Sequence, residues 1–225
     1  MGPTGSKIDS SGGCVTGLFI VFEGGDGVGK STQVRFLAEH LTHAGHRLVV
    51  THEPGDTPIG LKIRQVVLDP ATGDVDSRAE ALLIAADKAQ HVFEVIRPAL
   101  AAGQIVISDR YVDSMVAYQG AGRELGAEEI RGLAEWATGG LVPDLTVILD
   151  VEPDRAVNRI REKDRVEGAG DAFHERVRKE FLDLADAAPE RYLVLYARDT
   201  REANAAAIAA RVDALLAERA DSSAS

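Results

Sequence analysis

Short apolar runs alternate with longer amphipathic segments along most of the chain. Five runs have the length and aliphatic character of strands buried on both faces: Leu18–Phe22, Arg47–Thr51, Gln104–Ser108, Leu145–Asp150 and Tyr192–Tyr196. Helical patterns lie at Ser31–Ala44, Ile59–Leu68, Ser77–Ala102, Ala127–Thr138, Pro153–Arg161, Glu175–Ala187 and Arg201–Glu218. This alternation predicts an α/β fold with a five-stranded parallel sheet and helices on both faces.

The organisation along the chain indicates one domain. Residues 17–219 contain no internal repeat and no interdomain linker, and Pro98 is expected to bend or end the regular part of its long helix. Residues 1–16 are rich in Gly and Ser and lack the apolar core of a signal peptide, so we expect a mobile N-terminal tail. Residues 220–225 are expected to form a second, C-terminal tail.

Composition narrows the class of protein. The 225 residues are 45% hydrophobic, which is enough for one sizeable core. The net charge of −11 disfavours binding to a nucleic-acid polymer. A single cysteine, Cys14, allows no internal disulfide and suits a reducing cytosol. No apolar run approaches the ~18 to 20 residues of a membrane span. These features predict a cytoplasmic protein without membrane contact.

The most informative motif joins the first strand to the first helix. Its spacing is Gly-x-x-x-x-Gly-Lys-Ser, and we expect all of its residues to bind ATP: Gly24, Gly25, Asp26, Gly27, Val28, Gly29, Lys30, Ser31 and Thr32. Glycines let backbone N–H groups turn toward phosphate oxygens, while Lys30 reaches the β- and γ-phosphates and Ser31 reaches Mg²⁺. A plain strand-to-helix turn would not need this complete spacing, so the motif predicts binding of a nucleoside triphosphate.

A second polar group follows the third strand. Asp109 stands where a Walker-B-type carboxylate would act on Mg²⁺, together with Ser31. Arg110 would then enter the crevice where open α/β sheets bind ligands, as a partner for a phosphate group. The alternative is an ordinary strand-end Asp paired with its Arg neighbour, and Asp150 also ends a strand. The adjacent Arg110 favours Asp109.

Two further segments indicate a second anion site. Glu53-Pro54-Gly55 follows the second strand, and Arg64 lies on the next helix. Residues 162–172 are charged and contain Gly, which fits either a solvated loop or a lid that carries Arg161 and Arg165 over phosphates. We expect the lid, over about residues 161–174. Lys30, Arg110, Arg161 and Arg165 are then the predicted catalytic residues.

Two phosphate sites favour a kinase that acts on a phosphorylated small molecule. The acceptor phosphate is already a nucleophile, so catalysis needs alignment and charge neutralisation rather than a strong base. The Asn-Lys-x-Asp motif of GTPase switches is absent from the sequence. Two alternatives stay open, namely a kinase for any of several nucleoside monophosphates and a nucleotide-binding regulatory protein with little turnover.

The order of the motifs resembles bacterial thymidylate kinase from about Gly17 to Leu216. The matching segments are Phe22-Glu23-Gly24, Asp26, Glu53-Pro54-Gly55, Asp109-Arg110-Tyr111, Ala117-Tyr118-Gln119-Gly120 and Pro143-Asp144-Leu145-Thr146, followed by the lid-like Asp164-Arg165 and Phe173-His174-Glu175-Arg176. The resemblance implies a P-loop nucleoside monophosphate kinase that makes dTDP from dTMP with ATP and Mg²⁺, in dTTP synthesis. Gly27 replaces the P-loop arginine of the eukaryotic enzymes, so the basic groups are expected in the lid.

The resemblance also implies roles for individual residues. Asp26 would bind the deoxyribose 3′-OH, and Arg64 and Arg110 the dTMP phosphate, while Tyr118 would crowd a 2′-OH. The implied substrate-binding set is Asp26, Glu53, Pro54, Arg64, Ile84, Lys88, Arg110, Met115, Tyr118 and Gln119. Three of these depart from the family around the base, where Ile84 replaces an aromatic residue, Lys88 an Arg, and Met115 a polar residue. The family is usually homodimeric. The helix over Ser77–Ala102 would then either supply the dimer face or be an ordinary core helix.

Overall fold

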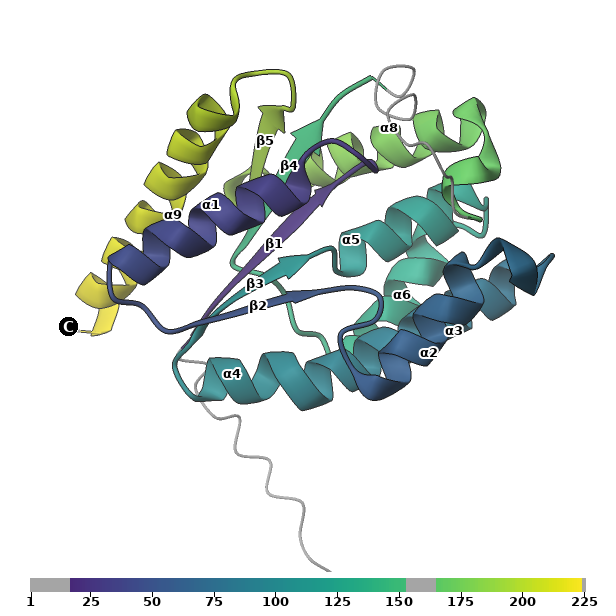
Figure 1. Cartoon of the computed structure of the whole chain (residues 1–225), viewed down its shortest axis with the longest axis horizontal. Helices are drawn as coiled ribbons and strands as arrows, with labels where there is room; N and C mark the ends of the chain where they lie inside the picture. Colours follow the sequence, from purple (N-terminus) through teal and green to yellow (C-terminus); the bar gives the residue numbers. More distant parts are fainter. Residues whose placement is uncertain (1–16, 153–164, 224–225) are drawn as a thin grey trace, which may run out of the picture.

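A parallel sheet forms the centre of the molecule (Figure 1). The computed structural model describes residues 17–152 and 165–223. Its strands are β1 (Leu18–Gly24), β2 (Leu48–His52), β3 (Ile105–Asp109), β4 (Leu145–Asp150) and β5 (Tyr192–Tyr196), in the order β2-β3-β1-β4-β5. Every neighbouring pair is parallel. The five predicted strands are confirmed to within two residues at each end, and the predicted α/β fold class with them.

The predicted helices that fall within residues 17–152 and 165–223 are present, with ends shifted by up to five residues. They are α1 (Lys30–His43), α2 (Pro58–Leu68), α3 (Ser77–His91), α4 (Arg97–Ala101), α6 (Ala127–Thr138), α8 (Asp171–Ala187) and α9 (Arg201–Ser223). The helix expected at Pro153–Arg161 and the N-terminal tail of residues 1–16 lie outside the described residues. The boundary expected at residue 220 falls inside α9. No helix in the described ranges has the length and apolar character needed to cross a bilayer.

The long helix expected over Ser77–Ala102 is not regular throughout. Between α3 and α4 the chain forms a π-helical turn, Val92–Ile96, in which the Arg97 N–H donates to the Val92 carbonyl five residues back. Pro98 then stands in the first turn of α4, where its missing N–H leaves no helical bond unmade. The helix is therefore interrupted before Pro98 and continues past it.

The helical segment after β3 was not predicted. It consists of α5 (Val112–Met115) and a second π-helical turn, Val116–Gly122. Gly120 and Gly122 are poor helix formers, so the pattern gave no helical signal. Short 3₁₀ turns at Pro70–Thr72, Glu167–Ala169 and Pro189–Arg191 were also not predicted. The segment after β3 carries several residues of the candidate site.

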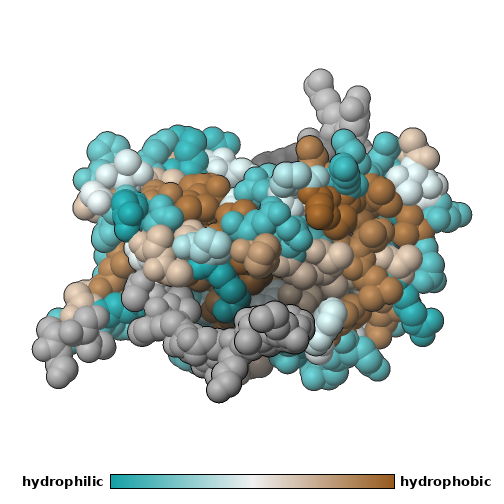
Figure 2. All heavy atoms as spheres, turned by 90° about the horizontal axis from the view of Figure 1, so that it is seen from below, coloured by the Kyte–Doolittle hydropathy of each residue, from teal (hydrophilic) through white to brown (hydrophobic). Residues whose placement is uncertain are grey.

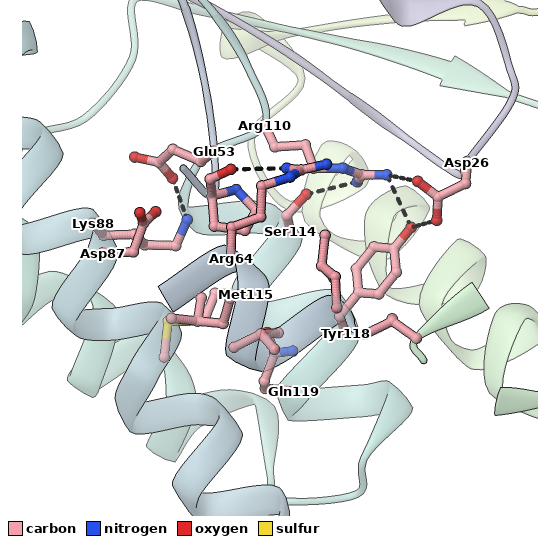
Figure 3. A pocket seen from close by; sticks show the side chains of 15 residues that line it. Asp26, Glu53, Arg64, Asp87, Lys88, Arg110, Ser114, Met115, Tyr118 and Gln119 are labelled. Carbon is pink, nitrogen blue, oxygen red and sulfur yellow. Dashed lines mark hydrogen bonds and ion pairs between the residues drawn. The ribbon is translucent and has the colours of Figure 1, made fainter. Parts of the chain in front are cut away.

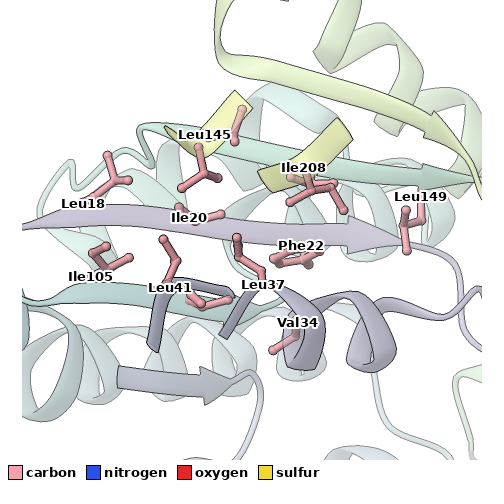
Figure 4. Packing of buried hydrophobic residues seen from close by; sticks show 13 residues of the cluster. Leu18, Ile20, Phe22, Val34, Leu37, Leu41, Ile105, Leu145, Leu149 and Ile208 are labelled. Atoms are coloured by element: carbon pink, nitrogen blue, oxygen red, sulfur yellow. The ribbon is translucent and has the colours of Figure 1, made fainter. Parts of the chain in front are cut away.

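Helices cover both faces of the sheet. On one face, α1 and α9 pack on alternate side chains of β1, β3 and β4, as Figures 1 and 4 show. On the other face, Phe19, Val21 and Val106 pack against residues of the α3–α4 region. A further apolar cluster joins α2, α3, α6 and the segment after β3. In open parallel sheets, ligands bind at the carboxyl ends of the strands.

A buried carboxylate ties β1 to the segment after β3. Glu23 is fully buried, and its Oε1 accepts from the N–H groups of Tyr111 (2.8 Å) and Ser114 (3.1 Å). Its Oε2 accepts from the Ser114 hydroxyl at 2.5 Å. Burial, together with the nearby Asp113 carboxylate, raises the pKa of Glu23 to about 7. Glu23 thus holds the start of α5 while favouring its own neutral form.

We expect Glu23→Gln to remove the loss of stability that ionisation of the buried Glu23 causes as pH rises. Glutamine keeps an acceptor for the two N–H groups, and its amide can still bond Ser114. Because the folded pKa of Glu23 lies above its ordinary value of 4.5, wild-type stability should fall relative to the variant as pH rises from about 4.5 to 7. The unfolding free energy of the variant minus that of the wild type should increase by about 2 to 3 kcal/mol between pH 4.5 and pH 8. An equal difference at both pH values would contradict the burial of an ionisable Glu23.

Candidate active site

The turn after β1 has the backbone of a phosphate-binding loop. Gly24 has φ of 127°, and a side chain there would collide with the Leu149 carbonyl of β4. Gly29 caps α1 in the left-handed region, with φ of 105°. Both positions favour glycine, because other residues are strained at positive φ. The N-terminus of α1 follows directly, so free N–H groups and the helix dipole face the hollow in front of it.

Lys30 folds back into this loop. Its ammonium donates to the carbonyls of Gly24 (3.1 Å) and Gly25 (2.7 Å), and the residue is buried. Burial and the neighbouring Arg110 charge lower the pKa of Lys30 to about 8. Among the described residues its ammonium hydrogen-bonds only these neutral carbonyls, so an anionic phosphate placed there would add a charged partner and stabilise the ammonium.

Ser31 and Asp109 meet beside the loop. The Ser31 hydroxyl donates to Asp109 Oδ2 at 3.1 Å, which brings the two predicted metal residues together. Within residues 17–152 and 165–223 no group of three or more His, Cys, Asp or Glu side chains has the arrangement of a metal site. Two oxygen donors fit Mg²⁺, which keeps several waters and usually takes phosphate oxygens as further ligands.

Arg110 connects the loop to the segment after β3 (Figure 3). Its φ is 74°, a region that non-glycine residues rarely adopt, and this turn directs the side chain into the crevice. Its guanidinium donates to the Gly24 carbonyl (3.1 Å) and the Ser114 hydroxyl (3.0 Å). It also pairs with Asp26 and reaches the Tyr118 hydroxyl at 3.2 Å.

The ion pair with Arg110 holds Asp26 in its ionised form. Its second oxygen accepts from the Tyr118 hydroxyl at 3.0 Å. Burial alone would raise the pKa of Asp26, but the charges of Arg110 and Lys30 outweigh it and lower the pKa to about 2. Asp26, Arg110 and Tyr118 therefore form one charged, hydrogen-bonded unit between two hollows.

One hollow runs along the P-loop and the other lies between the sheet and helices α2 and α3. The first is lined by Gly27, Gly29, Lys30, Ser31, Thr32 and Asp109 among others. All ten predicted substrate-binding residues line the second: Asp26, Glu53, Pro54, Arg64, Ile84, Lys88, Arg110, Met115, Tyr118 and Gln119. Asp26, Glu53, Arg64 and Arg110 line both hollows. The residues predicted for the donor and for the acceptor thus line adjacent hollows, and the hollows share two acidic and two basic side chains.

Three predicted P-loop residues lie elsewhere along the loop. Gly24 and Gly25 line a smaller hollow near α8, and their carbonyls bond Lys30. Val28 packs its side chain on the core cluster of β1, β3 and β4, so only its backbone is available to a ligand.

Lys88 lies deeper than the sequence suggested. It is only 2% exposed, and its ammonium pairs with Glu53 and donates to the Tyr111 carbonyl at 2.7 Å. His91 Nδ1 lies 2.7 Å from the other Glu53 oxygen. Burial alone would raise the pKa of Glu53, but Lys88 and His91 hold it below its usual value. In this structure Lys88 binds Glu53, whereas we expected it to face the base of the acceptor.

Of the two arginines predicted for the lid, the structure describes one. Arg161 lies outside the described residues. Arg165 does not extend toward the P-loop but packs on the end of α2, where its Nε donates to the Val67 carbonyl at 2.8 Å. Its Nη2 bonds Glu80, and its backbone N–H donates to Leu68 at 3.1 Å. The sequence predicts that Arg165 neutralises phosphates, whereas in the structure its guanidinium pairs with Glu80, a buried carboxylate of α3.

Sequence reasoning missed several residues of the second hollow. They are Val67, Leu68, Asp87, Ser114 and Val166. The apolar members carry no chemical signal, and Ser114 belongs to a helix that was not predicted. Asp87 is buried; its Oδ1 accepts from the Gly55 N–H at 3.0 Å, and its Oδ2 has no partner among the described residues.

Comparison with known proteins agrees with this geometry. The family model described as thymidylate kinase matches residues 22–208. A thymidylate kinase of Cutibacterium acnes is 58% identical over 200 residues, covering 89% of this chain and 98% of that protein. One from Clavibacter michiganensis is 54% identical over 209 residues, covering 90% and 98%.

A solved structure extends the similarity to three dimensions. The crystal structure of thymidylate kinase from Ehrlichia chaffeensis superposes with a TM-score of 0.72 at 31% identity, covering 88% of this chain and 98% of that one. On the family match and on these relatives, the chain belongs to the thymidylate kinase family.

Proposed function

We propose that the chain transfers the γ-phosphoryl group of ATP to dTMP and forms dTDP, as a step in dTTP synthesis. The observation that carries this proposal is the pair of adjacent hollows that share Asp26, Glu53, Arg64 and Arg110. A protein that only binds or hydrolyses one nucleotide has no need for a second phosphate-binding hollow at the same point. The family relationship selects dTMP among the possible acceptors.

The residues supply alignment and charge for an in-line transfer. Lys30 would leave the loop carbonyls for the β- and γ-phosphates of ATP, while the P-loop N–H groups hold the other oxygens. Arg110 and Arg64 would bind the dTMP phosphate, whose oxygen attacks the γ-phosphorus while the bond to the ADP oxygen breaks. The acceptor needs no strong base, because its phosphate is already ionised. Arg161, in the lid we expect, is our candidate for a further charge over the transferring group.

Mg²⁺ is the metal ion that the site fits. Ser31 and Asp109 would hold it directly or through water, because they present a hydroxyl and a carboxylate beside the triphosphate position. When bound, Mg²⁺ neutralises charge on the β- and γ-phosphates.

The second hollow suits a deoxyribonucleotide with a pyrimidine base. Tyr118 bonds Asp26 and Arg110, so its ring is fixed beside the place of the sugar and leaves little room for a 2′-OH. Asp26 offers an ionised carboxylate to the 3′-OH. Ile84 and Met115 supply apolar contacts for the base. A coupled assay with ATP and a panel of monophosphates tests the proposal, and a purine or ribonucleotide that outperforms dTMP would refute it.

We further propose a cytoplasmic homodimer. Apolar side chains are exposed on the side of α2 and α3, where Figure 2 shows brown surface toward the right. Leu82 is 58% exposed and Phe93 73%, and both lie on the long helix expected to supply a dimer face. Exposed apolar area of this kind is typical of an interface. One cysteine in the sequence is consistent with a reducing compartment.

The dimer gives a direct prediction. Phe93→Glu should produce a monomer in analytical ultracentrifugation, because it would bury a charge in the apolar interface. Val194→Glu, at a half-exposed position on β5, is the matched control and should leave the dimer intact. A Phe93→Glu protein that sediments like the wild type would place the interface elsewhere.

Lys30 should make ATP binding depend on pH. Its pKa of about 8 means that the free protein loses the ammonium above that pH, while bound triphosphate favours the charged form. ATP affinity should therefore fall as pH rises above 8, by up to about tenfold per pH unit. Calorimetry from pH 7 to 9.5 measures this.

Lys30→Ala is the matched control for this titration. It should bind ATP weakly at every pH and lose most phosphoryl transfer, since the missing charge acts on the transferring group. A wild-type affinity that stays flat up to pH 9.5 would contradict the perturbed lysine, and normal turnover by a folded Lys30→Ala protein would contradict its role.

Arg110→Ala should separate the two substrates. We expect weaker dTMP binding by roughly 1.5 to 3 kcal/mol and slower transfer, because a charged hydrogen-bonding group is lost from the acceptor site. ATP affinity should change little, since Lys30 and the loop N–H groups remain. Calorimetry with each nucleotide distinguishes these effects, and a loss confined to ATP would assign Arg110 to the donor.

A further inference from the structure

A buried carboxylate of α3 collects four hydrogen bonds beside the second hollow. Glu80 has no exposed surface. Its Oε1 accepts from Gln119 Nε2 (2.9 Å) and Arg123 Nε (3.1 Å). Its Oε2 accepts from Arg123 Nη2 (3.1 Å) and from Arg165 Nη2. One carboxylate thus joins Gln119 and Arg123, which are close in sequence, to the distant Arg165.

The donors hold Glu80 in its ionised form. Burial alone would raise the pKa of Glu80, but the hydrogen bonds from Arg123, Gln119 and Arg165 lower it. An ionised carboxylate only accepts hydrogen bonds. Gln119 must therefore direct its NH₂ group toward Glu80, which fixes the orientation of its amide.

This orientation decides what Gln119 offers to a ligand. Gln119 lines the second hollow, and its amide oxygen has no donor among the interactions of residues 17–152 and 165–223. With the NH₂ group committed to Glu80, the hollow receives a hydrogen-bond acceptor. A base with a ring N–H, as in thymine, satisfies that acceptor, whereas the unprotonated ring nitrogen of cytosine would meet it with a lone pair.

The same carboxylate fixes a second wall of the hollow. Arg165 bonds Glu80, the Val67 carbonyl and, through its backbone, Leu68. Its neighbour Val166 is buried and lines the hollow. Arg123 covers the cluster from outside, with its guanidinium 5.0 Å from the centre of the Phe173 ring. Glu80 therefore anchors the chain at residues 165–166 to α2 and α3.

We propose that Glu80 is a positioning residue for the acceptor site. It orients the Gln119 amide so that the site selects a base with a ring N–H, and through Arg165 it holds the Val166 wall against the ligand. Glu80 itself does not line the hollow, so it acts only through these neighbours. The proposal rests on the proposed function, since it concerns how the same site reads its acceptor.

The first experiment measures binding of dTMP and dCMP to Glu80→Gln by calorimetry. The introduced glutamine has its own NH₂ group, so it no longer dictates which way Gln119 turns. We expect dTMP affinity to fall about tenfold, the preference for dTMP over dCMP to fall by a similar factor, and ATP affinity to stay within twofold. Asp144→Asn is the control, because Asp144 pairs with Arg219 near the start of β4; it should leave the preference unchanged.

A double-mutant cycle distinguishes positioning from general destabilisation. If Glu80 sets the preference through Gln119, Glu80→Gln should not change the preference further once Gln119→Leu is present. A folded Glu80→Gln protein with wild-type preference overturns the proposal. So does a loss of preference that is equally large in the Gln119→Leu background. A wild type without preference for dTMP would instead refute the proposed function.

Arg165→Met tests the second wall and stays informative if Glu80→Gln does not fold, because Arg123 and Gln119 still satisfy Glu80. We expect the KM for dTMP to rise about tenfold with kcat within twofold, since the Val166 wall loosens while the transfer machinery is intact. An unchanged KM with a large fall in kcat would show that Arg165 serves the phosphoryl transfer and would overturn this part of the proposal.

Discussion

The site depends on the contact between Arg110 and Asp26. The two side chains come from loops 84 residues apart, one after β1 and one after β3, and their ion pair lies where the two hollows meet. Arg110 also bonds the Gly24 carbonyl and Ser114, so one guanidinium bridges the phosphate-binding loop and the segment after β3. Because these strands are adjacent and parallel, the sheet brings the two loops to the same edge.

This arrangement also explains how an acidic chain binds two polyanions. The net charge is −11, yet Lys30, Arg64 and Arg110 gather at the carboxyl ends of the strands. Asp26 balances part of this positive charge in the free protein. A bound phosphate would take over that balance. Arg64 and Arg110 already line the hollows before a ligand arrives, and Lys30 has only to leave the loop carbonyls.

The fold could be predicted largely from the sequence, because short apolar runs for the strands alternate with amphipathic segments for the helices, and both patterns are local. The P-loop residues could be placed from their motif at the end of the first strand, and the ten acceptor-site residues from the resemblance to the family. Lys88 lines the second hollow as expected, but its pairing with Glu53 could not be predicted, since Glu53 is 35 residues away in the sequence. The contact between Arg165 and Glu80 could not be predicted either, because the two residues are 85 positions apart in the sequence.

The helical turn at residues 112–122 shows another limit of sequence patterns. Its glycines argue locally against a helix, but a buried Glu23 from β1 bonds its first N–H groups and tertiary packing stabilises the rest. Tyr118 and Gln119 depend on this turn for their positions. The sequence therefore named Tyr118 and Gln119 for the site without predicting the helical turn that holds them.

The most direct test of the account is binding of an analogue in which adenosine and thymidine are joined by five phosphates. It spans both hollows, so one equivalent per chain should displace both ATP and dTMP, with an affinity far above that of either nucleotide. Titration calorimetry with competition by each nucleotide measures this. An analogue that binds no more tightly than ATP, or that leaves dTMP bound, would contradict the claim that the two hollows form one continuous site for phosphoryl transfer.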